Sequence, residues 1–445
     1  MSSFNGIIAE YNFISVDYFC DRALQACAFF LSHFHSDHMA GLESNVFFEK
    51  LRSGGATLFM HKLTATLMLS DHRYKRLEPF INSWETNVPF LVCSTNDSCA
   101  KSATVTLLPG GHCIGSVMLL FEGSEGPVLY TGDERVSLFD WKSFPLLHID
   151  GELKQLTSLY FDSTFCTPHT RQFPSRWEAV KAASKIAADW LKKNSENRIL
   201  LKCPYQYGYE FLFCQLSKRL KQKIHVNERL LRAYETVADI SDCLTDSCDE
   251  TRLHAFVSLE RGRDDVENHK CCKAVHNSNT VLTLRPSVMW FAARKNTKCV
   301  KYFTSQTVCH ILYSNHSSFD EVVAMVSYLK PKSLYPCVLP NTCSADDFHN
   351  FLMSSPLGQF QLKLSGCLRP TAIHHQIYTK KALSRQCSHS RRTTSKHASS
   401  LCQISKKSLA GSYVISPASE PCEDGNRAAA SSFKNVIQKS AVDQK

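Results

Sequence analysis

The sequence of 445 residues predicts an α/β protein with a strand-rich N-terminal region, a following α/β unit and a basic C-terminal tail. Short apolar runs rich in β-branched and aromatic residues recur up to about residue 165, and such runs are typical of strands. After residue 175, helical and strand-like segments alternate, which is the pattern of a parallel α/β unit. Apolar residues make up 43% of the chain and charged residues 21%, as in ordinary globular proteins. The length suits two domains and a tail.

The predicted elements follow from these patterns in chain order. The strands of the N-terminal region lie in "ACAFFLSH", "ATLFMH", "ATVTLLPGGH", "VMLLFEG", "GPVLYTGD" and "SLYFDST", several of which end in a histidine or an aspartate. A helix is predicted after Ser175, because Ser175 and Glu178 form a capping box ahead of apolar residues at helical spacing. "RILLKCP", "YEFLFCQLSKRLK" and "KIHV" then predict strand, helix and strand. "VCHILYSNHSS", "FDEVVAMVSYLK" and "SLYPCVLP" predict the strand, helix and strand that close the folded region.

The net charge of +10 is concentrated in the tail. Residues Thr371 to Lys445 contain 12 Lys and Arg against 4 Asp and Glu, so only +2 remains for the rest of the chain. The tail is rich in serine and poor in aromatic residues, which predicts a disordered, solvated segment open to phosphorylation. Transient contact with nucleic acid and a nuclear import signal are the alternatives for this tail.

The N-terminal stretch has neither the basic region nor the apolar block of a signal peptide. No apolar run reaches membrane-spanning length, and we therefore expect an intracellular protein. Under that expectation the 20 cysteines are reduced thiols, some buried and some available as metal ligands, and not a disulfide framework.

The segment "FLSHFHSDHMAGL" carries the strongest functional motif, with the spacing HxHxDH directly behind an apolar strand. His33 and His35 are two residues apart, so in an extended segment both side chains project to one side and can hold one ion. Asp37 and His38 lie on the turn that follows and can face a second ion. This pattern arises by chance in on the order of one chain in a thousand of this size.

Further ligands are expected at other strand ends. His112 in "LLPGGHCIG" and Asp133 in "VLYTGDERV" each follow an apolar strand, within a turn that contains glycine. We expect His33, His35 and His112 on one metal, Asp37 and His38 on another, and Asp133 bridging the two. Imidazole and carboxylate ligands without thiolate suit Zn²⁺ at a hydrolytic site. Asp17, also at a strand end, is expected to support these ligands, with a surface position as an equal alternative.

These motifs resemble a known fold. "HFHSDH", "GGHCIGSVMLLFEG" and "LYTGDERV" resemble the metallo-β-lactamases, and the chain up to about Pro340 resembles their β-CASP branch, specifically the DNA cross-link repair family. The resemblance extends to "YFDSTFC", "YGYEFLF", "KIHVN", "RPSVMWF", "NHSSF" and "YPCVLP". It implies an αββα sandwich with an inserted β-CASP α/β domain that covers the active-site cleft. The implied divisions are residues 1–165 and 306–365 for the sandwich, 166–305 for the insert and 366–445 for the disordered basic tail.

The resemblance also implies roles for three further residues. Asp162 in "YFDST" and His316 in "NHSSF" match the first and second β-CASP motifs, which pair near the metals, and His316 is the favoured general acid. Without the resemblance, His316 would be interpreted as a hydrogen-bonded loop histidine. Val338 stands at the third motif, where RNA-cleaving relatives carry histidine and the DNA branch carries valine. The resemblance therefore implies a DNA substrate and a weaker second metal site, at which Mg²⁺ or Mn²⁺ can replace Zn²⁺.

The chain departs from the family pattern at three positions. Ile114 replaces a proline, and Glu134 replaces a phenylalanine beside Asp133, where an extra carboxylate would repel a phosphate unless it points away. Tyr209 stands in "GYE", where exonuclease relatives have a lysine that holds a 5′ phosphate. We expect Tyr209 to stack on an unpaired base, which favours endonuclease activity, with packing against the following helix as the alternative. Ser116 and Val338 are further predicted substrate-binding residues.

The resemblance implies, in addition, a structural zinc held by two histidines and two cysteines in the insert. His225 and His254 match the histidine positions. Phe256 stands where the first cysteine should be, and the second is Cys271 or Cys272. Three ligands make a poor structural zinc site, so the completeness of this site stays open, with a neighbouring thiol as substitute.

The function implied by the resemblance is that of a zinc-dependent DNA endonuclease in the nucleus. It would hydrolyse phosphodiesters at hairpins, overhangs and single/double-strand junctions during double-strand break repair by end joining. A 5′–3′ exonuclease activity and a role in cross-link repair stay open beside it. The implied partners are DNA and end-joining proteins such as a DNA-dependent kinase. Two alternatives remain: a small-substrate hydrolase of the same fold, which would not need the insert, and a weakly active scaffold that binds DNA ends.

Overall fold

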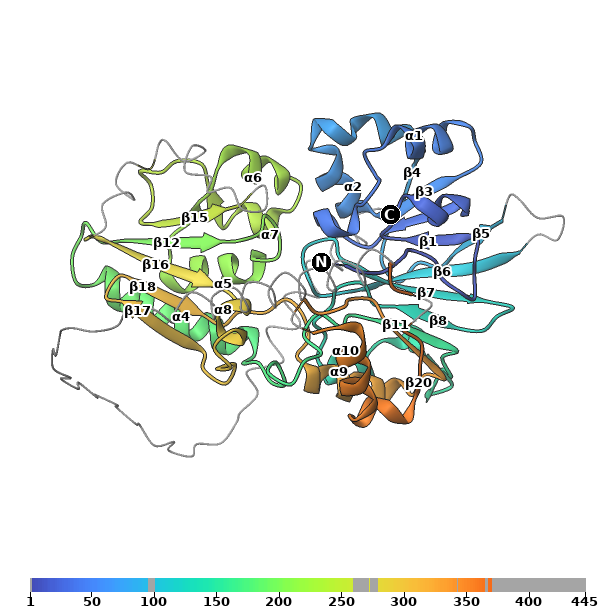
Figure 1. The fold of residues 1–445 in the computed structure, drawn as a ribbon. Helices are drawn as coiled ribbons and strands as arrows, with labels where there is room; N and C mark the ends of the chain where they lie inside the picture. Colours follow the sequence, from blue (N-terminus) through green and yellow to red (C-terminus); the bar gives the residue numbers. More distant parts are fainter. Residues whose placement is uncertain are drawn as a thin grey trace, which may run out of the picture. The chain divides into compact units, whose positions relative to one another are not determined.

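The computed structural model describes residues 2–94, 101–258, 272, 279–341, 343–364 and 367–369 (Figure 1). Residues 1–373 form one compact unit, and nearly all of the predicted tail lies outside the described residues. Among the described helices, none has the length and the apolar composition needed to cross a bilayer. The described cysteines are all free thiols, as expected for an interior without a disulfide framework.

Two sheets form the sandwich. The first is parallel, in the order β1-β2-β3-β4, with β1 (Ile14–Val16), β2 (Ala28–Leu31), β3 (Thr57–His61) and β4 (Ile81–Trp84). The second is mixed, in the order β20-β19-β11-β8-β7-β6-β5. Its strands are β5 (Phe90–Cys93), β6 (Ser102–Pro109), β7 (Val117–Gly123), β8 (Val128–Tyr130), β11 (Ser158–Phe161), β19 (Ser333–Pro336) and β20 (Gln361–Leu362). Each strand predicted for the N-terminal region is present.

The apolar core explains why four layers form. Alternate residues of β2 point to opposite faces, so Phe30 joins the core between the two sheets while Phe29 and Leu31 join a core on the outer face. That outer core lies under α1 (Asn45–Arg52), α2 (Lys62–Leu69) and the 3₁₀ helix η3 (His72–Phe80). On the second sheet, α9 (Phe319–Leu329) and α10 (Ala345–Met353) bury Phe319 and Phe348 in the central core. The order of layers is helix, sheet, sheet, helix, which confirms the predicted metallo-β-lactamase fold.

Shorter elements connect these layers. They are the 3₁₀ helices η1 (Asp21–Gln25), η2 (Ser36–His38), η4 (Pro145–Leu147) and η7 (Pro356–Gln359), the helix α3 (Leu138–Lys142), and the two-stranded sheet of β9 (His148–Ile149) and β10 (Glu152–Leu153).

The α/β insert leaves the sandwich after β11 and returns before α9. Although more than a hundred and fifty residues separate β11 from β19, the two strands pair in parallel, with Tyr160 opposite Tyr335. Their carboxyl ends therefore lie side by side. The insert leaves after β11 and returns through the loop of His316, whose imidazole contacts Asp162 at the end of β11. This arrangement agrees with the resemblance to a β-CASP insertion.

The insert is built around a second seven-stranded sheet in the order β14-β13-β15-β12-β16-β18-β17. All neighbours are parallel except β17 and β18. Its strands are β12 (Arg198–Cys203), β13 (Ile224–His225), β14 (Leu244–Thr245), β15 (Leu253–Val257), β16 (Val281–Pro286), β17 (Lys301–Ser305) and β18 (Val308–Ile311). Its helices are α4 (Arg176–Leu191), α5 (Glu210–Leu220), α6 (Glu228–Ala233), α7 (Ala238–Ser241) and α8 (Met289–Ala292). The predicted capping box of Ser175 and Glu178 begins α4.

The packed region continues past the predicted start of the tail at residue 366. Cys367 and Leu368 are buried, and Leu368 forms a β-bridge with Phe4. The Arg369 amide donates a hydrogen bond to the Ser3 carbonyl at 2.7 Å. Residues 367–369, which the prediction assigned to the tail, are therefore packed against the N-terminal residues.

Candidate metal centre

The predicted ligands come from strands of both sheets of the sandwich and meet where these strands end. His33, His35, Asp37 and His38 follow β2, His112 lies in the turn between β6 and β7, and Asp133 follows β8. Asp162 follows β11 and Val338 follows β19. The carboxyl ends of parallel strands share one edge of a sheet, and this edge commonly carries the functional loops of α/β folds.

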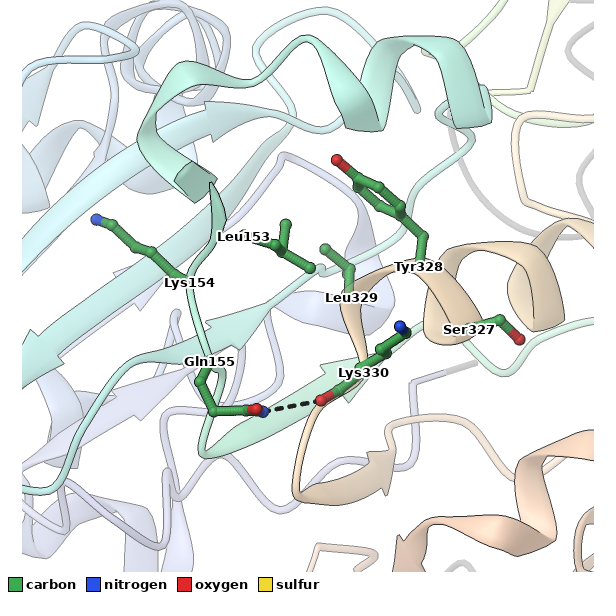
Figure 2. A pocket seen from close by; sticks show the side chains of 7 residues that line it. All are labelled: Leu153, Lys154, Gln155, Ser327, Tyr328, Leu329 and Lys330. Carbon is green, nitrogen blue, oxygen red and sulfur yellow. Dashed lines mark hydrogen bonds between the residues drawn. The ribbon is translucent and has the colours of Figure 1, made fainter. Parts of the chain in front are cut away.

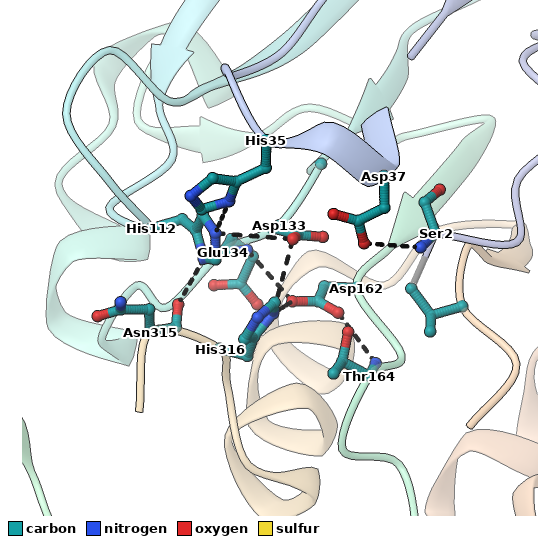
Figure 3. A network of polar contacts seen from close by, with 12 residues as sticks. Ser2, His35, Asp37, His112, Asp133, Glu134, Asp162, Thr164, Asn315 and His316 are labelled. Carbon is teal, nitrogen blue, oxygen red and sulfur yellow. Dashed lines mark hydrogen bonds and ion pairs between the residues drawn. The ribbon is translucent and has the colours of Figure 1, made fainter. Parts of the chain in front are cut away.

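Asp133 lies at the centre of the cluster and is close to three of its histidines (Figure 3). Its Oδ2 lies 3.6 Å from His33 Nε2, 3.2 Å from His38 Nε2 and 3.7 Å from His112 Nε2. One ligand atom each from His33, His35, His112 and Asp133 lies within 4.8 Å of the others. The structure thus brings together the set predicted for the first metal.

The opposite nitrogen of three of these imidazoles is held by the protein. His33 Nδ1 lies 3.0 Å from Ser32 Oγ, and His112 Nδ1 lies 3.1 Å from the Asn315 carbonyl oxygen. His38 Nδ1 lies 2.8 Å from Asp17 Oδ2. These contacts orient the rings with Nε2 directed into the cluster. Nε2 of His33 and of His38 is buried and has no hydrogen-bond partner among the described residues, which fits atoms that ligate an ion. The donor set is therefore suited to a metal.

The HxHxDH segment differs locally from the extended conformation that we predicted. The His35 amide donates to the His33 carbonyl at 3.1 Å, so the chain bends between the two residues. Their rings still lie 4.7 Å apart, and His35 Nδ1 lies 3.0 Å from His112 Nε2. The convergence of the two histidines thus comes from a turn and not from strand alternation.

Asp37 lies apart from the histidine set. Its Oδ2 accepts a hydrogen bond from the Ser2 amide at 3.0 Å, and in Figure 3 it lies on the other side of Asp133 from His35 and His112. Its carboxylate belongs to none of the tightly grouped ligand sets among the described residues. Burial and the Asp133 carboxylate raise the pKa of Asp37, but His38 outweighs them and the pKa is lowered, so Asp37 is ionised.

Asp17 is buried behind the ligands and not at the surface. Its Oδ1 accepts from the Ser32 amide at 2.7 Å, and its Oδ2 accepts from Ser32 Oγ at 2.6 Å and Tyr130 Oη at 2.8 Å, in addition to the His38 contact. The residue adopts φ of +55°, a left-handed conformation in which aspartate and asparagine are the most tolerated non-glycine residues. Asp17 is therefore placed to fix the orientation of His38.

The charges of the cluster follow from burial and from these contacts. Burial and the neighbouring imidazoles hold the pKa of His33 and His112 well below its ordinary value, which keeps both rings neutral, as ligation requires. Burial opposes the charged form of His38, but Asp133 and Asp17 outweigh it and raise its pKa. Burial likewise disfavours ionised Asp133, but His38 and His316 outweigh this effect and lower its pKa.

Asp162 and His316 form a pair beside the cluster. His316 Nδ1 lies 2.7 Å from Asp162 Oδ2, and the Thr164 amide donates to Asp162 Oδ1 at 2.9 Å (Figure 3). Burial lowers the pKa of His316, but Asp162 and then Asp133 outweigh it and raise the pKa to about 9. The ring of Phe165 contacts the imidazole at a centroid distance of 5.7 Å. His316 is therefore oriented by Asp162, whose carboxylate favours the charged form of the imidazole.

Glu134 is folded into its own turn. Its Oε2 accepts from the Val136 amide at 2.8 Å, and the side chain is 1% exposed. Burial and the nearby Asp162 raise the pKa of Glu134 to about 8, so the carboxyl is largely neutral at pH 7. The repulsion that we expected between Glu134 and a phosphate is thereby removed. Ile114, the other substituted position in this region, is buried in the turn that carries His112.

The three predicted substrate-binding residues have mainly structural contacts. Tyr209 is only 4% exposed and packs against Phe213 and Tyr313 at 6.2 and 6.1 Å between ring centroids. The expected stacking of Tyr209 on a base is therefore wrong, and packing against the following helix is what the structure shows. Ser116 Oγ accepts from the His112 amide at 3.1 Å and shapes that turn. Val338 is buried, and its amide donates to Ser163 Oγ at 2.9 Å.

Sequence reasoning missed the residues that hold these loops. Arg176 donates from Nε to the Ser314 carbonyl at 3.2 Å and from Nη2 to the Gly111 carbonyl at 2.5 Å, so it ties the loop of His316 to the loop of His112. Arg135 also donates to the Ser314 carbonyl, at 3.2 Å. An arginine in a helix or turn has no sequence signature for such a role, because its acceptors are backbone atoms distant in the chain.

A second cluster lies in the insert. His225 Nδ1 and His254 Nδ1 are 3.4 Å apart, and Cys272 Sγ lies 3.2 Å from the former and 3.7 Å from the latter. All three residues are buried and form a group of metal-binding geometry. Phe256 and Cys248 pack beside Cys272. Of the two predicted cysteines, Cys272 is thus placed with the histidines, and Cys271 lies outside the described residues.

A pocket of about 400 Å³ elsewhere in the sandwich lacks such chemistry. It is lined by Leu153, Lys154, Gln155, Ser327, Tyr328, Leu329 and Lys330 (Figure 2). Gln155 Nε2 donates to the Lys330 carbonyl at 2.9 Å. With no imidazole or carboxylate in its lining, this pocket is not a candidate for the catalytic site.

Comparison with known proteins agrees with this geometry. The family described as DNA repair metallo-beta-lactamase matches residues 238–342. The chain is 36% identical to protein artemis of Rattus norvegicus over 358 residues, which covers 79% of this chain and 51% of the relative. It is 30% identical to 5′ exonuclease Apollo of Gallus gallus, with 78% and 66% coverage, and 29% identical to DNA cross-link repair 1A protein of Gallus gallus, with 73% and 31% coverage. The chain spans about half the length of the artemis proteins it matches. With the fold, the ligand cluster and these similarities in agreement, the chain belongs to the DNA repair metallo-β-lactamase family.

Proposed function

We propose that this protein is a metal-dependent DNA nuclease that cuts phosphodiesters at hairpins, overhangs and single/double-strand junctions. The observation that carries the proposal is the position of the Asp162–His316 pair beside the histidine–aspartate cluster. His316 Nδ1 lies 2.7 Å from Asp162 Oδ2 and 3.9 Å from Asp133 Oδ2. A metal site and a proton donor are thus within reach of one bound phosphate. The names of the relatives, which include an exonuclease and a cross-link repair protein, support DNA as the substrate.

The donor chemistry supports zinc as the metal. We assign His33, His35 and His112 to one ion and Asp37 and His38 to a second, with Asp133 shared. These nitrogen and oxygen donors suit Zn²⁺, and the second set, with fewer imidazoles, suits Mg²⁺ or Mn²⁺ as well. When bound, such an ion supplies Lewis acidity, which polarises the phosphate and makes water a nucleophile at neutral pH. Asp17 and Ser32 hold the ligating rings.

Within that frame, His316 acts as the general acid. Asp162 fixes Nδ1 of the imidazole and favours its charged form, so the proton available at the other nitrogen can be donated to the leaving oxygen. The same division of labour between a carboxylate and an imidazole operates in hydrolytic triads. Val338 offers no ligand atom, which supports the weaker second metal and, by the family pattern, a DNA substrate.

Two alternatives are less well supported. A small-substrate hydrolase of this fold needs neither the seven-stranded insert nor the Asp162–His316 pair. A weakly active scaffold would follow from a charged Glu134 at the site, but this carboxyl is buried and largely neutral. Since Tyr209 is buried, the preference for endonuclease over 5′–3′ exonuclease activity now rests only on the missing lysine at that position.

The wider setting is also part of the proposal. A role in the nucleus, in end joining or cross-link repair and in contact with a DNA-dependent kinase, follows from the family resemblance. The cluster of His225, His254 and Cys272 supports a structural zinc in the insert. Cys248 packs against the apolar cluster that contains Cys272 and is the neighbouring thiol that we propose as the fourth ligand.

The decisive experiment measures cleavage of labelled DNA by the purified full-length chain. Hairpin, overhang and blunt substrates, each with a 5′ phosphate or a 5′ hydroxyl, are offered with Zn²⁺, Mg²⁺ or Mn²⁺ after chelation. Hairpin opening that depends on added metal and is indifferent to the 5′ group supports the endonuclease. Cleavage only of phosphorylated ends would assign the protein to the exonucleases, and no cleavage by metal-loaded protein would refute the proposal.

A further inference from the structure

The last strands of the insert form a surface with an unusual charge. In the sequence, no aspartate or glutamate occurs from Asn268 to Phe319. The described part of this stretch carries five cations, which are Arg285, Arg294, Lys295, Lys298 and Lys301. None of the five has an ion-pair partner within the part of the chain that the structure describes. Other surface cations of this protein, such as Arg171 and Arg229, are paired.

Exposed aromatic rings lie among these cations. All five residues of the edge strand β17 are exposed, with Tyr302 at 48% and Phe303 at 47%. Arg285 of β16 and Tyr302 of β17 both pair in register with His310 of β18, so the three side chains form one row on a single face of the sheet. In this row the guanidinium of Arg285 and the ring of Tyr302 therefore lie on either side of the His310 imidazole.

Trp290 in α8 and Arg294 just after this helix extend the row. The Trp290 ring stacks on His310 with centroids 4.1 Å apart and an angle of 17°, and lies 5.2 Å from the Tyr302 ring. Arg294 also lies over the Trp290 ring, with Cζ 3.9 Å from the ring centroid. We name this surface the cationic edge and define it by Arg285, Trp290, Arg294 and Tyr302.

The cationic edge borders the catalytic region. Trp290 packs against a small apolar cluster that contains Phe165, and the Phe165 ring contacts the imidazole of His316 at 5.7 Å. Strand β18, which carries His310, also leads directly into the loop of His316. A strand of nucleic acid that leaves the metal centre past His316 therefore meets this surface next.

We propose that the cationic edge binds the single-stranded arm of the DNA substrate, an inference that rests on the proposed nuclease function. Unpaired cations suit backbone phosphates, whereas half-exposed rings suit unpaired bases, since only unstacked bases offer a free face. If paired duplex occupied this surface, it would contact the cations alone, and loss of the surface would weaken blunt and arm-bearing DNA equally. If an acidic protein segment occupied the surface instead, its loss would leave DNA binding unchanged.

The test measures binding without cleavage, with full-length protein in the presence of a chelator. Fluorescence anisotropy compares a duplex that carries a single-stranded arm with the matching blunt duplex over a range of salt concentrations. In the variant Arg285→Gln/Arg294→Gln/Tyr302→Ser, we expect about tenfold weaker binding of the arm-bearing DNA, because stacking and charge are both removed. The salt dependence of that binding should fall by about 1.4 in slope, since two cations no longer meet single-strand phosphates. Binding of the blunt duplex should not change.

The matched control is Lys181→Gln/Lys192→Gln/Phe139→Ser, which removes two lysines exposed on or just after α4 and the aromatic ring of α3, itself 66% exposed. It should bind both DNAs like the unaltered protein. An equal loss for arm-bearing and blunt DNA, or no loss, would overturn the proposal. If the triple variant melts early, the single variants Tyr302→Ser and Arg294→Gln decide by the same criterion. This test measures binding and not cleavage. The binding of single-stranded arms at the cationic edge can therefore be refuted while the protein still cleaves DNA, and cleavage can be absent while the arms still bind, so the two proposals are tested separately.

Discussion

Replacement of Asp17 by asparagine tests whether Asp17 orients the metal ligand His38, because the replacement leaves every proposed ligand in place. Asp17 touches no substrate, but its Oδ2 accepts the hydrogen bond that fixes His38 Nδ1 at 2.8 Å. Asparagine has the same shape and tolerates the φ of +55°, so the backbone stays unstrained. The amide that replaces Oδ2 is a donor, and His38 must then either give up this hydrogen bond or place its proton on Nε2, where it blocks ligation.

The size of the effect follows from the hydrogen bonds that the asparagine variant cannot form. The Ser32 amide keeps its acceptor in the variant, and the hydroxyls of Ser32 and Tyr130 can rotate to accept. One or two charge-assisted hydrogen bonds are therefore removed, which lowers the free energy of unfolding by about 2–4 kcal/mol. Removal of such a supporting partner weakens metal binding by about 10- to 100-fold. Cleavage should fall at limiting metal and recover when metal is in excess.

The assay is metal content after dialysis against graded chelator, with cleavage measured at limiting and saturating metal. Asp21→Asn is the matched control, because Asp21 also has a positive φ of 54° but is exposed and contacts only the Tyr18 hydroxyl among the described side chains. If Asp17→Asn holds metal as tightly as Asp21→Asn, Asp17 does not set the ligating nitrogen of His38 and the reasoning is refuted.

Four further predictions concern individual groups. His316→Ala should retain metal but cut about 10²- to 10⁴-fold more slowly, as expected when a general acid is removed, and an unchanged rate would exclude that role. Since His316 donates its proton only below its raised pKa, Asp162→Asn should move the alkaline limb of the kcat/KM profile to lower pH, and an unshifted limb would contradict the pairing. Asp37→Ala should nearly abolish cleavage while the fold and the first metal persist, as circular dichroism and metal analysis can show. His225→Ala should lower the zinc content by one equivalent, and an unchanged content would remove the structural zinc.

Another prediction follows from the C-terminal boundary. A chain that ends after Arg369 should fold and cut at low salt, with a weaker salt dependence of DNA binding once the basic tail is absent. A chain that ends after Leu364 loses the buried Cys367 and Leu368 and should be less stable by about 3 kcal/mol, measured by denaturant unfolding. Equal stability of the two chains would show that this segment contributes nothing.

The sequence by itself determined the elements that depend on local pattern. The strands and helices follow from hydrophobic periods and caps, such as the capping box at Ser175, because these signals act over a few residues. The grouping of His33, His35 and His112 with Asp133 was also predicted, because ligand-type residues recur at strand ends. The strand β2 belongs to one sheet and the strands β6 and β8 to the other, so the packing of the two sheets brings these ends together.

Tertiary structure alone decided how the side chains at these strand ends are used. Tyr209 is buried by residues from another strand end, and Glu134 is neutralised by burial beside Asp162, neither of which leaves a trace in local sequence. The cationic edge likewise depends on strand register, which brings Arg285 and Tyr302 to the same histidine across two neighbouring strands. Burial, pKa and cross-strand register arise from contacts between residues far apart in the chain, and a one-dimensional pattern does not encode them directly.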